Sequence, residues 1–104
     1  MILTTGIAVE GRPMQEYLDV VTSQVIMGVH IGRDIKAWGR GIVGGRSGTY
    51  EEEFAKAVRE AKDELRAAAE ALGADAVIAI AFDYEEVGDE MLMVAASGTA
   101  VLLQ

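Results

Sequence analysis

Residues 71–82, which read ALGADAVIAIAF, decide the fold of this chain. The stretch begins with alanine and leucine of a helical pattern and, after Gly73, becomes apolar without interruption from Ala76 to Phe82. Glycine ends a helix readily because it takes the left-handed backbone conformation without penalty. A short apolar run bounded by a turn is typical of a strand that is covered on both faces. The stretch therefore predicts a helix that is followed directly by a buried strand.

The helix extends upstream, from about Tyr50 to Leu72. Thr49 and Glu52 have the spacing of a capping box, which places the start of the helix. Apolar residues recur at steps of three and four, so they line one face of the helix. We expect this apolar face to pack against a sheet. This apolar stripe consists of Phe54, Val58, Ala61, Leu65, Ala68 and Leu72.

Further strands are predicted on both sides of the helix. The strand after the helix continues to Val87, and a turn at Gly88-Asp89 leads to a second long strand, Met91 to Leu103, with Gly98 as a candidate bulge. These two strands are expected to pair as an antiparallel hairpin. Residues 20–31 alternate, with an apolar face and a more polar face that Ile26 interrupts, and a short strand is expected before them near residues 2–5.

The element order predicts an α+β fold: a small antiparallel sheet with one long helix packed on it, in the order β-β-α-β-β. A short amphipathic helix is plausible between the second strand and the long helix, where Ile35, Trp38 and Ile42 have helical spacing. The chain has 104 residues and neither an internal repeat nor a linker, so residues 1–104 are expected to form one domain.

Composition limits the classes of function. The chain has no cysteine, which excludes disulfides, thiolate metal sites and a cysteine nucleophile. The net charge of −8 argues against general nucleic-acid binding, and no stretch approaches the roughly 20 apolar residues of a membrane span. The N-terminus lacks the features of a signal peptide, so we expect a cytoplasmic protein.

The last two strands are apolar on both faces, and one helix can cover only one face of the sheet. We therefore expect the second face to be buried between subunits of a symmetric homo-oligomer. The alternative is that residues 1–10 and 32–43 fold over the second face within a monomer.

Several segments together resemble the YbjQ family, in a likeness that runs over most of the chain. They are Ile42–Tyr50 (IVGGRSGTY), Ala71–Val77, Phe82–Glu85, Met91–Val94 and Ser97–Val101. The resemblance implies a dodecin-subunit-like fold that assembles into a ring, usually a pentamer. The family is labelled "putative heavy-metal-binding", which passes on a metal ion as a candidate cofactor, and the resemblance transfers no catalytic residue.

His30 is the candidate metal ligand. Without cysteine, a site made by the protein alone must combine this single histidine with carboxylates or methionines. In a ring, one histidine from each subunit could converge on the axis. The simpler interpretation is a histidine on the wetter face of its strand, bonded to water or to a neighbour.

The candidate anion site is a loop that precedes the long helix. Backbone N–H groups at a helix N-terminus attract anions, and Arg46 adds positive charge. Glu51 to Glu53 occupy the same first helical turn and would repel an anion, so a structural glycine turn is the competing interpretation. The loop consists of Gly44, Gly45, Arg46, Ser47 and Gly48.

Three functions compete on this basis. The first is a non-enzymatic oligomer that binds a small ligand or an ion. The second is a scaffolding oligomer that engages a protein partner through its acidic surface. The third, an enzyme built at subunit interfaces, would use His30, Arg46 or the carboxylates Asp83, Glu85 and Glu86, but the sequence shows no nucleophile–base pair.

Overall fold

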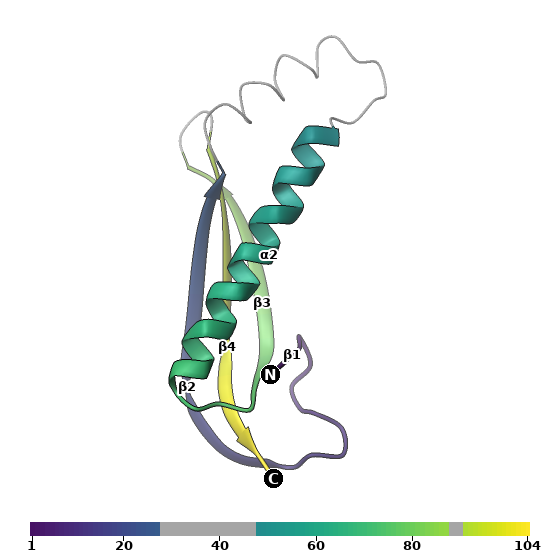
Figure 1. The fold of residues 1–104 in the computed structure, drawn as a ribbon, viewed down its shortest axis with the longest axis vertical. Coiled ribbons are helices and arrows are strands. Elements are labelled where there is room, and N and C mark those ends of the chain that lie inside the picture. Colours follow the sequence, from purple (N-terminus) through teal and green to yellow (C-terminus); the bar gives the residue numbers. More distant parts are fainter. Residues whose placement is uncertain (28–47, 88–90) are drawn as a thin grey trace.

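The computed structural model describes residues 1–27, 48–87 and 91–104. Over these residues the chain is an α+β unit with one helix and a four-stranded sheet (Figure 1). The order of the elements along the chain confirms the predicted β-β-α-β-β arrangement, whereas the short helix and the Gly88-Asp89 turn were predicted for residues outside the described ranges. The elements are β1 (Ile2–Leu3), β2 (Met14–Met27), α2 (Gly48–Ala71), β3 (Ala76–Glu86) and β4 (Leu92–Leu103).

The sheet has the strand order β1-β3-β4-β2 and is mixed, which corrects the prediction of an antiparallel sheet. β4 pairs antiparallel with both β3 and β2, but β1 pairs parallel with β3. A tight hairpin forces two strands to be antiparallel, and no such turn joins β1 to its partner. The chain instead crosses from β1 at one edge to β2 at the opposite edge, around the end of the sheet near both termini (Figure 1).

The predicted hairpin of β3 and β4 is confirmed, but its bulge lies in β3 and not at Gly98. The register shifts between Ile78, which pairs with Thr99, and Ala81, which pairs with Ser97. Ala79 takes a left-handed φ of 52° inside the bulge, and its N–H donates to the Gly6 carbonyl at 2.8 Å. Gly98 lies opposite the bulge, and a side chain does not fit there because a Cβ would approach Val77 Cγ1 to 2.6 Å.

β2 begins at Met14, six residues earlier than the predicted start at Val20. Residues 14–19 do not alternate regularly because the register to β4 shifts between Met14 and Glu16 and again between Tyr17 and Asp19. From Val20 onward the predicted alternation is confirmed: Val21 and Met27 are buried, while Thr22 and Gln24 are exposed. Because its first half does not alternate, the residue pattern predicts only the second half of this strand.

α2 lies along one face of the sheet and buries much of the predicted stripe. Ala61 and Leu65 are fully buried, while Leu72, beyond the last helical residue, is 44% exposed and leaves the stripe. Gly73 has a φ of 77° and ends the helix as predicted. Its N–H donates to the Glu70 carbonyl and the Ala74 N–H to the Ala69 carbonyl, which is the hydrogen-bond pattern of a Schellman motif.

The main core lies between α2 and the sheet. The interior also contains Ser23, a polar residue among the apolar side chains of β2. Its Oγ donates to the Ala61 carbonyl oxygen at 2.7 Å, which satisfies the buried hydroxyl and ties the strand to the middle of the helix. The buried members of this core are Val21, Met27, Ala57, Ala61, Leu65, Ala69, Val77, Ile80, Val94, Ala96 and Ala100.

A second, smaller core lies on the other face of the sheet, near the end where the chain terminates. It consists of Ala76, Ile78, Val101 and Leu103, with Val9 and Met14 packed against it. Asp75 closes this end, since its Oδ2 accepts the Leu103 N–H at 2.9 Å and its N–H donates to the Val101 carbonyl. The chain therefore covers part of the second face with its own N-terminal segment.

Candidate functional site

The two sites predicted from sequence fall almost entirely outside the described residues. His30 lies there, as do Gly44, Gly45, Arg46 and Ser47 of the glycine loop. Gly48 is described only as the first residue of α2, so the loop leads directly into a helix N-terminus. The metal and anion assignments stay predictions.

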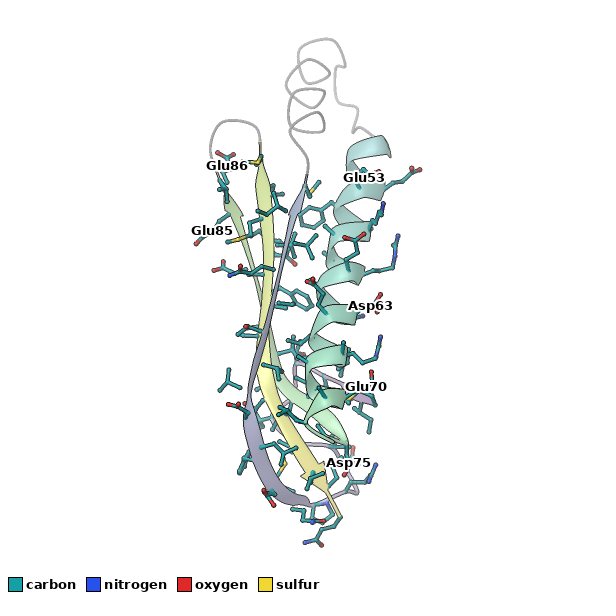
Figure 2. The ribbon with its side chains drawn as sticks, turned by 60° about the vertical axis from the view of Figure 1, so that its left-hand side comes forward. Glu53, Asp63, Glu70, Asp75, Glu85 and Glu86 are labelled. Atoms are coloured by element: carbon teal, nitrogen blue, oxygen red, sulfur yellow. The ribbon has the colours of Figure 1, made fainter. Side chains whose placement is uncertain are left out.

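The carboxylates of β3 belong to the far end of that strand. Asp83, Glu85 and Glu86 are all exposed, and Figure 2 shows Glu85 and Glu86 on the part of the sheet distant from Asp75. Asp83 Oδ1 accepts the N–H of the next residue, Tyr84, at 3.1 Å. Among residues 1–27, 48–87 and 91–104, no three His, Asp or Glu side chains gather closely enough to hold a metal ion.

The exposed helix surface is charged. Asp63 and Glu70 point away from the sheet (Figure 2), and Arg66 pairs with Asp63 at 2.9 Å. Near the start of the helix, Phe54 packs against Tyr84 of β3, with ring centroids 5.1 Å apart. Exposed charge on the outer side and an aromatic contact on the inner side are what an amphipathic helix on a sheet requires.

The sheet face opposite α2 is the most unusual surface of the described structure. Residues that alternate with the buried ones of β2 point to this side, and Val20 and Ile26 there are 66% and 55% exposed. Aliphatic side chains of this size are normally covered when they gather on a sheet. We call this surface the open face; its residues are Val20, Thr22, Gln24, Ile26, Ala81, Asp83, Glu85, Met93, Ala95, Ser97 and Thr99.

The residues of β2 and β4 on the open face carry no formal charge, whereas β3 contributes the carboxylates Asp83 and Glu85 to it. The register pairs Ile26 with Met93, so the apolar surface continues from β2 onto β4 there, and it pairs Val20 with Thr99. Val9 and Met14 cover only the end of this sheet side that holds Val101 and Leu103. Within the described residues, the N-terminal segment thus covers one end of the second face, as the monomeric alternative expects of residues 1–10.

Sequence reasoning located the apolar positions but missed Ser23. A serine flanked by Thr22 and Gln24 looks like a residue of a solvent-exposed face, and only the two-residue spacing that separates it from Val21 and Val25 indicates a buried position. It also missed the bulge at Ala79, because a run of apolar residues contains no sign of where the alternation shifts by one residue.

Two comparisons with known proteins show the family. A family model described as "Putative heavy-metal-binding", that of the YbjQ family, matches residues 1–104. A UPF0145 protein of Bacillus cereus (strain ATCC 10987 / NRS 248) is 48% identical over 101 residues, which cover 97% of this chain and 98% of the relative. The chain therefore belongs to the YbjQ family.

A solved structure supports the fold. The crystal structure of a DUF74-family protein of unknown function from Pediococcus pentosaceus ATCC 25745, at 2.73 Å resolution, is similar with a TM-score of 0.59. The two chains share 23% sequence identity, and the likeness covers 100% of this chain and 98% of that one. No helix in the described ranges has the length and apolar character to span a membrane.

Proposed function

We propose that this protein is a homo-oligomer, ring-forming and most simply pentameric, that binds a small ligand or a metal ion without catalysing a reaction. The observation that carries the proposal is the open face, where Val20 and Ile26 are more than half exposed in the single chain. Burying an aliphatic side chain of this size contributes about 1.5–3 kcal/mol, so covering the face favours association.

A second copy of the chain is a suitable cover because the part of the open face that β2 and β4 form is uncharged. Each chain has a net charge of −8, so two copies repel one another where their acidic surfaces meet. The acidic residues of α2 lie on the opposite side of the molecule from the open face (Figure 2). Association through the β2 and β4 part of the open face brings neutral surfaces together and keeps the charges of α2 in water.

The ring and its ion rest on family membership. A ring brings equivalent residues around one axis, so a single histidine in each subunit becomes several ligands. His30 is the proposed metal ligand, and Gly44–Gly48 with Arg46 is the proposed anion loop. The family description, "Putative heavy-metal-binding", supports an ion as the ligand class.

The experiment is native mass spectrometry of the untagged protein, which measures subunit number and bound mass together. We expect a discrete oligomer that takes up Zn²⁺ after metal removal and reloading, and His30→Ala should lose that added mass but keep the subunit number. A matched pair tests the interface: Ile26→Asp should dissociate the oligomer, whereas Gln15→Asp, on an exposed irregular part of β2, should not. A monomeric wild type would contradict the proposal.

A scaffolding oligomer is the second candidate. The exposed surface of α2 favours it, because its charged residues include Glu60, Asp63, Glu64 and Glu70. In that case native mass spectrometry would show a bare oligomer that binds neither metal nor phosphate. A basic partner peptide would bind the acidic surface with an affinity that falls as salt is added.

A further inference from the structure

The outer edge of β2 has no strand beside it in the described structure. β2 is the last strand of the sheet and pairs only with β4 among these residues. The Val20 N–H donates to Asp19 Oδ1 at 2.7 Å, so it is not engaged with β4. Since successive residues of a strand direct their N–H and C=O groups to opposite sides, Thr22, Gln24 and Ile26 direct theirs to the same open edge.

This edge is not protected in the usual way over its second half. Proteins keep exposed edge strands from pairing by means of charged residues, prolines or bulges. β2 has Glu16, Asp19 and two register shifts in its first half. Residues 20–27, VVTSQVIM, contain no charge, proline or register shift. An edge of this kind is suited to pair with another strand.

We propose that β2 pairs antiparallel with β2 of a second copy of the chain, across a two-fold axis at Ser23. The sequence around this serine is symmetric in character: two aliphatic residues and a polar one precede it, and a polar one and two aliphatic residues follow it. Antiparallel pairing about Ser23 sets Val20 against the partner's Ile26, Thr22 against the partner's Gln24 and Val21 against the partner's Val25.

The backbone and the charges agree with this register. Even-numbered residues, whose N–H and C=O groups point outward, meet even-numbered residues, so the two strands exchange hydrogen bonds as antiparallel pairs do. Cross-strand partners are apolar with apolar and polar with polar, which stabilises a sheet. Asp19 falls opposite the partner's Met27, so no carboxylate faces another. An unrelated extended peptide would satisfy the backbone but would not supply these matched side chains.

The inference rests on the proposed self-association and adds a specific contact to it. A two-fold contact uses the same surface on both copies and cannot by itself close a ring with an odd number of subunits. Together with a pentameric ring it would join two rings through their β2 edges, which gives an even total number of subunits.

Disulfide trapping tests the register, because the chain has no native cysteine. In Thr22→Cys/Gln24→Cys each cysteine faces a cysteine of the partner, at the Cα separation of about 5.5 Å that hydrogen-bonded antiparallel pairs and disulfides share. In the control, Gln24→Cys/Ile26→Cys, the cysteines have the same spacing along the strand but none faces another. After mild oxidation, we expect a covalent dimer on a denaturing gel at least tenfold more abundant in the first variant.

A charge exchange tests the same contact without covalent bonds. Thr22→Glu/Gln24→Glu sets like charges against one another in the pair, and the even-numbered assembly should fall to half its mass. Thr22→Glu/Gln24→Lys sets each glutamate against a lysine of the partner and should restore it.

The outcomes separate this contact from self-association in general. If neither cysteine variant cross-links but native mass spectrometry still shows an oligomer, the β2 contact is wrong and the proposed homo-oligomer stands. Equal cross-linking of the two cysteine variants also overturns the proposed register. A protein that is monomeric at all concentrations overturns both proposals.

Discussion

The two faces of the sheet carry similar aliphatic residues but have very different surroundings. On the face that α2 covers, Val21 and Val94 are almost completely buried, whereas Val20 and Ile26 on the open face are more than half exposed. Val20 and Val21 are neighbours in the same strand, so neither residue type nor secondary structure accounts for the difference. Whether an aliphatic position is buried in this chain depends on what packs over the sheet.

Small residues allow the covered face to close tightly. Ala57, Ala61 and Ala69 of α2 are buried against a sheet whose β4 contributes Ala96 and Ala100. Short side chains let the helix approach the strands closely, and close packing maximises dispersion contacts. The open face has small residues of the same kind in β4, Ala95 and Ser97 among them, but no helix in the described ranges lies over it. Small residues of β4 thus belong to the core on the face that α2 covers and to the surface on the open face.

The largest effect is expected for a cavity beneath the helix. Leu65→Ala should lower the free energy of unfolding by about 2–5 kcal/mol, because Leu65 is fully buried and the space it leaves is not refilled. Leu72→Ala is the matched control, at an exposed leucine just after the same helix, and should cost less than about 1 kcal/mol. Urea unfolding followed by circular dichroism measures both, and equal losses would contradict the packing described here.

The next effect concerns the bulge in β3. Gly98→Ala should destabilise the fold by about 1–3 kcal/mol, because the added Cβ would lie 2.6 Å from Val77 Cγ1 and 3.1 Å from the Ile78 carbonyl oxygen. Ser97→Ala, one residue away and on the open face, should change stability by less than about 1 kcal/mol. Thermal unfolding compares the two, and a neutral Gly98→Ala would show that β3 does not approach β4 this closely.

The same substitution, valine to threonine, should have different effects at the adjacent positions 20 and 21, which lie on opposite faces of the sheet. Val21→Thr should cost about 1–3 kcal/mol, since it buries a hydroxyl in the apolar core. Val20→Thr should leave the stability of the isolated chain within about 0.5 kcal/mol, but should weaken self-association. Unfolding at low protein concentration measures the first quantity and sedimentation velocity the second. A stable Val21→Thr would mean that the two faces are equivalent.

The smallest effect is a gain. Ala79→Gly should stabilise the protein by up to about 1 kcal/mol, because Ala79 has a φ of 52°, where a Cβ is strained and glycine is not. Ala81→Gly, just after the bulge in the same strand, should instead destabilise by roughly 0.5–1 kcal/mol. Denaturant midpoints compare the two, and a loss of stability in Ala79→Gly would show that the left-handed conformation is not strained.

Much of the fold was predictable because local patterns specify it. The helix, its end at Gly73, the hairpin of β3 and β4, and the buried face of residues 20–27 follow from periodicity and turn chemistry. Local patterns predict the candidate sites less completely than they predict the fold. His30 and Arg46 are predicted from residue type and local position, and the structure does not describe them. The open face and the free edge of β2 depend instead on which strands are neighbours.

The sequence by itself determined where the helix and strands lie and which of their faces are apolar, because those properties are set by residues a few positions apart. Only the tertiary structure decided that β1 lies parallel to β3, that β2 starts at Met14, and that a bulge at Ala79 brings Val77 and Ile80 onto one face. Each of these features depends on a partner distant in the sequence. A strand's direction, length and register are set by the strand beside it, and no local pattern contains that information.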